Sequence, residues 1–337
     1  MQSITEPRIH TPTGAPVREP VFILAAPHSL SSLLSAVLGQ HPEVYATPGL
    51  HLHGGALVCD SIAFARNEQP SRMHSLLRTI AHLYSSEQTV ESIEMARRWL
   101  RRRDHLPSAQ VHREICQKAA PRALIERCPV HAGTATILPF IGAAFPDVRF
   151  IYLVRHPFAQ GRATLGDLQS TKKLIRDHRQ NDAQTSELDP QFAWFETQIA
   201  ILEFLDAMPK ERQWHLRVED LAAEPDAVLG DLCSWLSLAW SSDILSAMLA
   251  FENSPFYGPG PINAPSGYDP ILRTLSPWLP LPAEPPLEGE LPWRKKTGLA
   301  PQTLKLAQAL GYDSAPTDDS QGASSLNPAT RSDEVLE

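Results

Sequence analysis

The chain has 337 residues, enough to bury a large core in one or two domains. Its hydrophobic content of 42% is that of an ordinary globular protein, and its formal charge of -8 gives no support for binding to nucleic acid or to an anionic membrane. No apolar stretch reaches the roughly 18 residues of a membrane span, and no signal peptide is visible. The four cysteines lack metal-type spacing, so we expect free thiols, no metal and a cytoplasmic protein.

Short apolar runs alternate with helical segments along most of the chain. After a polar leader at residues 1–19, strands are predicted at residues 21–26, 41–46, 123–126, 149–154 and 214–218. Helices are predicted at residues 31–39, 134–145, 191–208, 226–236, 241–250 and 299–310, with a helical insertion at about 60–120. Residues 254–292 are Pro-rich coil, and residues 313–337 form a disordered tail. This order predicts an α/β fold with a central, mainly parallel sheet flanked by helices.

Two of the predicted strands end in turns suited to phosphate. The strand at 21–26 continues into Pro27-His28-Ser29-Leu30-Ser31-Ser32 and then a helix, which together supply hydroxyls, backbone N–H groups and a positive dipole end. The strand at 149–154 ends at Arg155, a fixed cation. Neither turn has the Walker A or the Gly-x-Gly-x-x-Gly pattern. Two such turns on one sheet predict a nucleotide with two separated phosphate groups.

These segments resemble the sulfotransferases that use 3′-phosphoadenosine 5′-phosphosulfate, especially the bacterial ones. The run from Pro27 to Leu34 is similar to the family's Pro-Arg-Ser-Gly-Ser/Thr-Ser/Thr-Leu-Leu loop. The run Leu153-Val154-Arg155-His156-Pro157 is similar to its Leu-Val-Arg-His-Pro motif. Further similarities lie at residues 125–129 and 216–221. The resemblance covers residues 20–312 and implies the P-loop-like, three-layer sulfotransferase fold.

The resemblance also implies roles for individual residues. The 5′-phosphosulfate would bind the loop residues Pro27, His28, Ser29, Leu30, Ser31 and Ser32. The 3′-phosphate would bind Arg155, with Thr164 next to the position of a family serine. Arg127 would approach the transferring group, His51 is the candidate general base, and His28 is a candidate catalytic group in the place of a family cation. His53 and Glu126 are candidates for contact with the acceptor, and the transfer itself requires no metal.

The implied reaction moves a sulfuryl group from the nucleotide to a hydroxyl of a small-molecule acceptor, either free or bound to a carrier protein in a biosynthetic pathway. Much of the acceptor pocket would come from the helical insertion. The chain departs from the family pattern at His28, Leu30, Gly49 and Ala163, where relatives have a cation, a glycine, an acidic residue and a serine. Two alternatives therefore stay open: an enzyme of this fold with a reaction independent of the nucleotide, and a non-catalytic binding protein.

Each candidate residue also has a purely structural interpretation. Ser31 and Ser32 can cap a helix, and Arg155 can pair with a carboxylate. His51 and His53 can be ordinary loop histidines, and Glu126 can form a structural salt bridge. The segment 293–296 can close over a nucleotide or form a surface turn.

Overall fold

The structure is a computed structural model. It describes residues 17–68, 72–129, 137–166, 189–261 and 286–312, together with residues 264, 267, 272, 281 and 284. The predicted tail at 313–337 and most of the predicted leader lie outside the described residues.

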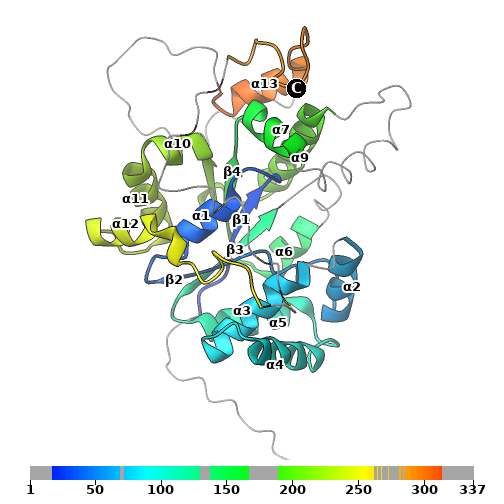
Figure 1. Cartoon of the computed structure of the whole chain (residues 1–337), viewed down its shortest axis with the longest axis vertical. Helices are drawn as coiled ribbons and strands as arrows, with labels where there is room; N and C mark the ends of the chain where they lie inside the picture. The colour runs from blue at the N-terminus through cyan, green and yellow to red at the C-terminus, as the bar shows by residue number, and fades with distance from the viewer. Residues whose placement is uncertain are drawn as a thin grey trace, which may run out of the picture.

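A sheet of five parallel strands in the order β2-β3-β1-β4-β5 forms the centre of the fold (Figure 1). The strand β1 lies in the middle, and all of its side chains are buried, which accounts for its unbroken apolar sequence. The strands are β1 Val21–Ala25, β2 Val44–Thr47, β3 Ala123–Pro129, β4 Arg149–Val154 and β5 Gln213–Arg217. All five strands predicted from the sequence are therefore present.

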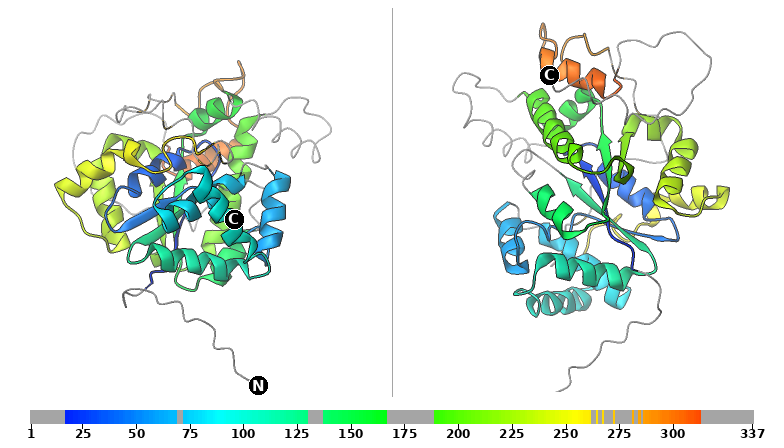
Figure 2. Two further views of the ribbon diagram at one scale, coloured as in Figure 1. Left: turned by 60° about the horizontal axis from the view of Figure 1, so that its bottom comes forward. Right: turned by 180° about the vertical axis from the view of Figure 1, so that it is seen from behind.

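Helices cover both faces of the sheet, as Figure 2 shows from behind, and the faces follow the alternation of side chains along β1. Val21, Ile23 and Ala25 pack on the face with α1 and α11, whereas Phe22 and Leu24 pack on the face with α6, α9 and α13. The first set of helices is α1 Ser31–Leu38, α10 Val218–Ala223, α11 Pro225–Leu236 and α12 Ser242–Leu249. The second set is α6 Leu138–Ala144, α7 Pro157–Gly166, α9 Pro190–Asp206 and α13 Pro301–Ala309.

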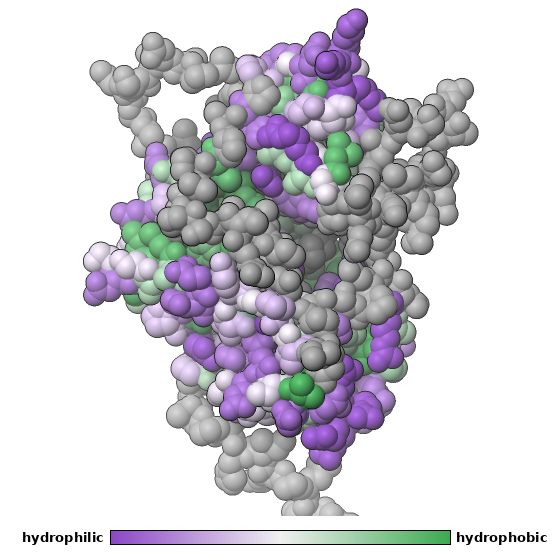
Figure 3. All heavy atoms as spheres, viewed as in Figure 1, coloured by the Kyte–Doolittle hydropathy of each residue, from purple (hydrophilic) through white to green (hydrophobic). Residues whose placement is uncertain are grey.

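The described residues of the predicted helical insertion, between β2 and β3, form four helices. They are α2 Val58–Glu68, α3 Met73–Ser85, α4 Val90–Arg101 and α5 Ser108–Ala119. They bury a core of their own, and their outer surface in Figure 3 is mostly hydrophilic. Arg78 of α3 is buried and donates hydrogen bonds to the carbonyl oxygens of Pro255 and Gly258, which connects the insertion to the segment after α12.

The main differences from the sequence prediction are at helix ends. The helix α6 begins at Leu138 rather than at residue 134, and residues 134–136 lie outside the described part. Short 3-10 turns at Lys210–Arg212 and Phe251–Asn253 were not predicted. Among the described residues, no helix combines the length and the apolar character needed to cross a membrane.

Candidate active site

The strand register places the two phosphate-type turns at the same level. Ala25 at the end of β1 pairs with Leu153 of β4, so Pro27 and Arg155, each two residues further on, emerge together at the carboxyl edge of the sheet. On its other side Ala25 pairs with Pro129, which brings the end of β3 to the same edge. Ligands of parallel sheets bind at this edge.

The loop after β1 has an unusual backbone. His28 and Leu30 adopt left-handed conformations with φ of 65° and 59°. Leu30 is the N-cap residue of α1, and no side chain caps this helix, so its first amide groups have no capping partner from a side chain. The glycine of the family pattern thus falls on a position that needs positive φ. Positive φ costs a leucine about 1–2 kcal/mol of conformational free energy. Burial of the Leu30 side chain in the core offsets this cost.

Ser29 is fully buried and its hydroxyl donates a 2.9 Å hydrogen bond to Oε1 of Gln160 on α7. Thr164, one turn further along α7, donates its hydroxyl to the carbonyl of Gln160 at 2.9 Å. The two predicted donor-site residues Ser29 and Thr164 are therefore both connected to Gln160, which the sequence analysis missed. Gln160 belongs to no recognisable sequence motif. The one hint in the sequence is that it follows Arg155 by five residues.

Arg155 contacts the loop after β1, residues 27–32, which we call the donor loop because the family resemblance links it to the donor nucleotide. Its Nη1 donates a 2.8 Å hydrogen bond to the carbonyl of His28, and its own carbonyl accepts one from the indole of Trp194 at 3.0 Å. Burial lowers the pKa of the Arg155 guanidinium from its usual range, and the nearby carboxylates of Glu219 and Glu284 oppose this effect. Its Nε is buried and has no hydrogen-bond partner among the described residues. A buried guanidinium with a spare donor is suited to an anion.

Arg127 lies beside the start of α1. Its Nη1 donates a 2.7 Å hydrogen bond to the hydroxyl of Ser32, so this serine contacts a cation rather than capping its own helix. Both residues line a cavity of about 20 Å³ together with Ser35, Pro48 and Phe256. This volume has room for about one water molecule.

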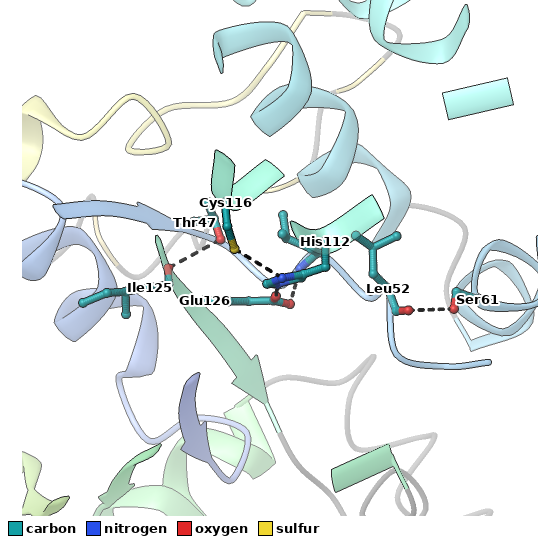
Figure 4. Close-up of polar contacts among 8 residues, drawn as sticks. Thr47, Leu52, Ser61, His112, Cys116, Ile125 and Glu126 are labelled. Atoms are coloured by element: carbon teal, nitrogen blue, oxygen red, sulfur yellow. Dashed lines mark hydrogen bonds and ion pairs between the residues drawn. The ribbon is translucent and has the colours of Figure 1, made fainter. Parts of the chain in front are cut away.

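Glu126 precedes Arg127 on β3 and therefore points to the opposite face of the sheet. It is buried, and its Oε1 accepts a 2.8 Å hydrogen bond from the amide of Leu50, next to His51. Its Oε2 lies 2.9 Å from Nε2 of His112 on α5, and Nδ1 of His112 lies 3.6 Å from Sγ of Cys116 (Figure 4). The carboxylate of Glu126 thus connects the His51 loop to the helical insertion.

His51 has positive φ of 56°. Burial and the positive charges of Arg72 and Arg127 lower the pKa of His51 to about 3, so its imidazole is neutral at neutral pH. A Cβ atom added at Gly49 would lie 3.0 Å from the Arg127 carbonyl and 3.1 Å from Nε2 of His51. The family pattern has an acidic residue at position 49. Here the His51 ring occupies the space next to this position, so a larger side chain would be crowded and glycine fits.

His53 lies deeper than His51. Its ring contacts Phe22 and Phe145 edge-on, with centroid distances of 5.6 and 5.8 Å. Burial and the neighbouring His112 lower the pKa of His53 to about 3, against the opposing effect of Glu126. The structure thus brings His53, Glu126 and His112 together, although their sequence spacing shows no cluster. Nothing in the sequence pointed to His112, which lies within the insertion.

Trp293 packs on the helix that follows Arg155. A Cβ atom added at Gly161 of α7 would lie 2.3 Å from the Trp293 ring. The indole N–H donates to Oδ1 of Asp189 at 3.0 Å, and Arg294 pairs with the same carboxylate at 3.2 Å. The segment that contains Trp293 is therefore attached to α7 and to the start of α9.

The comparisons with known proteins agree with this arrangement. A sequence model of the Sulfotransferase family matches residues 20–242. The chain belongs to the sulfotransferase family. The family model thus spans the donor loop, His51, Arg127 and Arg155. No curated protein sequence matches the chain.

Two solved structures of sulfotransferase domains match nearly the whole chain. The domain from the curacin biosynthetic pathway is 24% identical, covers 88% of this chain and 99% of its own length, and has a TM-score of 0.67. The domain from the Synechococcus PCC 7002 olefin synthase is 21% identical, covers 90% and 98%, and has a TM-score of 0.66. At these identities the likeness establishes the sulfotransferase fold, as the sequence predicted.

Proposed function

We propose that this sulfotransferase moves a sulfuryl group from 3′-phosphoadenosine 5′-phosphosulfate to a hydroxyl of a small-molecule acceptor. The observation that carries the proposal is the position of Arg155. Its guanidinium is hydrogen-bonded to the carbonyl of His28, and its buried Nε has no partner among the described residues. An anion at the sheet edge would satisfy this donor, as a nucleotide phosphate does.

The donor loop would bind the 5′-phosphosulfate. The start of α1 supplies amide groups and a positive dipole end without a side-chain cap, and the hydroxyls of Ser31 and Ser32 lie there. When the sulfuryl group leaves, negative charge develops on the phosphate, and a fixed cation beside it lowers the barrier. Arg127, bonded to Ser32 at 2.7 Å, is our candidate for that cation. His28 stands in the family's cation position, where a protonated imidazole would add a second donor.

His51 would accept the proton of the acceptor hydroxyl. Its imidazole is neutral and therefore has a free lone pair, but a pKa of about 3 describes a weak base. The bound nucleotide would add several negative charges near Arg127, and negative charge raises the pKa of a nearby histidine. We therefore expect His51 to become a stronger base once the donor is bound. Glu126 would position His51 through the Leu50 amide, and His53 would face the acceptor from the deeper side.

A biosynthetic acceptor is the chemical class we favour. The two similar domains come from the curacin biosynthetic pathway and from an olefin synthase. This chain matches them over almost their full length. We therefore infer an acceptor that is an intermediate of a biosynthetic pathway, presented free or on a carrier protein.

A second candidate function has one observation in its favour. The loop has Leu30, with φ of 59°, at the position of the family glycine. If Leu30 keeps the nucleotide away from the loop backbone, the fold would act on another substrate or bind one without turnover.

Transfer of labelled sulfate from the nucleotide to a panel of hydroxyl acceptors, free and carrier-bound, tests the proposal. We expect turnover by the wild type. In Arg127→Ala we expect a kcat that is about 100- to 1,000-fold lower, because loss of one donor that stabilises the transition state raises the barrier by about 3–4 kcal/mol. Arg122→Ala is the matched control, because Arg122 is exposed and precedes the other end of β3. Nucleotide binding without turnover on any acceptor would favour a binding protein, and absent nucleotide binding would favour a different reaction.

A further inference from the structure

Three side chains with metal-binding chemistry converge beneath the His51 loop. His53 comes from the loop after β2, His112 from α5 and Glu126 from β3. One ligand atom of each residue lies within 4.8 Å of the others. All three are buried, with exposed fractions of 6%, 0% and 3%. Residues so far apart in the sequence meet here only because the insertion folds back onto the sheet.

Hydrogen bonds account for two of the three residues. His112 and Glu126 bond to each other at 2.9 Å. Nε2 of His53, in contrast, is buried and has no hydrogen-bond partner among the residues that the structure describes. An imidazole nitrogen buried without a partner costs free energy, so its position beside a carboxylate and a second imidazole calls for an explanation.

Outer contacts orient two of the three residues. Nδ1 of His112 lies 3.6 Å from Sγ of Cys116 (Figure 4). Oε1 of Glu126 accepts a 2.8 Å hydrogen bond from the Leu50 amide. In metal sites, a ligating histidine commonly uses its second nitrogen in a hydrogen bond, and a ligating carboxylate is similarly supported. Both residues have such support here, and the contacts fix which of their atoms face the centre of the cluster.

We propose that His53, His112 and Glu126 form a site for one divalent ion of the Zn²⁺ class. Two imidazoles and one carboxylate suit Zn²⁺, Co²⁺ or Fe²⁺, whereas Mg²⁺ and Ca²⁺ prefer oxygen ligands alone. Metal–ligand distances of about 2.1 Å in a tetrahedral site place ligand atoms roughly 3.4 Å apart. The present separations, from 2.9 Å to at most 4.8 Å, bracket that value, so modest side-chain rotations suffice.

The surroundings strengthen the attraction for an ion. The rings of Phe22 and Phe145 pack against His112, with centroid distances of 5.6 and 5.0 Å. Such apolar neighbours lower the local dielectric and strengthen the attraction between a cation and the Glu126 carboxylate. A bound ion would fasten the loop that contains His51 to α5 and β3. The site shares His53 and Glu126 with the residues proposed to support His51 and the acceptor, and it is tested by metal binding rather than by turnover.

The test uses the full chain without a polyhistidine tag. After dialysis against a chelator, the protein is titrated with Co²⁺ and followed by the visible absorption of the bound ion. We expect one equivalent to bind to the wild type, and Zn²⁺ to displace it and raise the melting temperature. His53→Ala is the decisive variant, because it removes a ligand and no observed hydrogen bond. We expect it to weaken Co²⁺ binding by about 100-fold or more. Loss of a residue that only supports a ligand already weakens metal binding by about 10- to 100-fold, and loss of a ligand should weaken it at least as much.

Two further variants complete the test. His105→Ala removes an exposed histidine and should bind Co²⁺ like the wild type. Glu126→Gln keeps an acceptor for the Leu50 amide but removes the charge, and should also weaken binding. Absence of Co²⁺ absorption in the wild type, or equal binding by the wild type and His53→Ala, would overturn the proposal. Either result would leave His112 and Glu126 as a plain hydrogen-bonded pair.

Discussion

The guanidinium of Arg155 donates a hydrogen bond of 2.8 Å to the main-chain carbonyl of His28. This contact joins the loop after β1 to the end of β4. Strand register brings the two segments to the same level, because Ala25 pairs with Leu153 and each segment begins two residues later, at Pro27 and at Arg155. The two turns that the sequence linked to separate phosphates therefore lie next to each other at the carboxyl edge of the sheet. The contact also gives His28 a structural role that does not depend on its side chain.

The left-handed backbone at Leu30 leads to a prediction about stability. Glycine normally destabilises a helix relative to alanine by about 1 kcal/mol, but at positive φ the order reverses because alanine pays the steric cost. We expect Leu30→Gly to be more stable than Leu30→Ala by about 1 kcal/mol in urea denaturation. Leu33, inside α1 and buried in the same core, is the control. At this position Leu33→Ala should be more stable than Leu33→Gly. If alanine were the more stable replacement at both positions, the left-handed backbone at Leu30 would be contradicted.

The contact between Gly161 and Trp293 predicts a position-specific effect of alanine on α7. Gly161→Ala would force the Trp293 ring to move, because the new Cβ atom would lie 2.3 Å from it. We expect a loss of about 1–3 kcal/mol, the usual cost of overpacking, and faster proteolysis near residues 287–300. Gly166→Ala on the same helix meets no atom of the described residues within 4 Å and should stabilise the protein by up to about 1 kcal/mol. Similar melting temperatures for the two variants would show that Trp293 does not pack there.

A half-buried histidine on β5, His215, predicts part of the acid sensitivity. Burial, and to a lesser extent Lys210, lower the pKa of His215 to about 4. In the unfolded chain this histidine titrates near pH 6.5. Between these values the unfolded state binds the extra proton, so the free energy of unfolding falls as the pH drops from 6.5 to 4, by up to about 1.4 kcal/mol per pH unit.

His215→Phe should remove this part of the pH dependence while keeping the ring contact with Tyr152, whose centroid lies 5.2 Å away. Denaturation curves at several pH values measure the slope. His105→Gln, at an exposed histidine, is the control and should leave the slope unchanged. An unchanged slope in His215→Phe would mean that His215 is accessible to protons in the folded protein.

The sequence was sufficient for the sheet and for the positions of the two phosphate-type turns. The apolar runs at β1 and β4 mark strands that are buried on both faces, and the turns that follow them carry the family motifs. The left-handed conformation of Leu30 follows from its alignment with a family glycine. These features are local, so a single segment contains the signal.

The residues that support the candidate site from other parts of the fold could not be predicted in the same way. His112 and Gln160 act through partners 14 and 131 residues away in the chain, Glu126 and Ser29 respectively. Their positions depend on how the insertion and α7 pack on the sheet, and neither residue belongs to a recognisable motif. The glycine at position 49 could not be explained from the sequence either. The His51 ring lies next to it, and this proximity is visible only in the folded loop.

Calorimetric titration with adenosine 3′,5′-bisphosphate tests the central claim, that Arg155 and the donor loop form a nucleotide site. We expect micromolar binding by the wild type, weakened about 10- to 100-fold in Arg155→Ala, which corresponds to loss of a charged hydrogen bond. His28→Ala should have a smaller effect, because its carbonyl remains. Arg149→Ala, at the other end of β4 and bonded to the Trp235 carbonyl, should bind like the wild type. No binding at millimolar nucleotide, or equal binding by Arg155→Ala, would contradict the account.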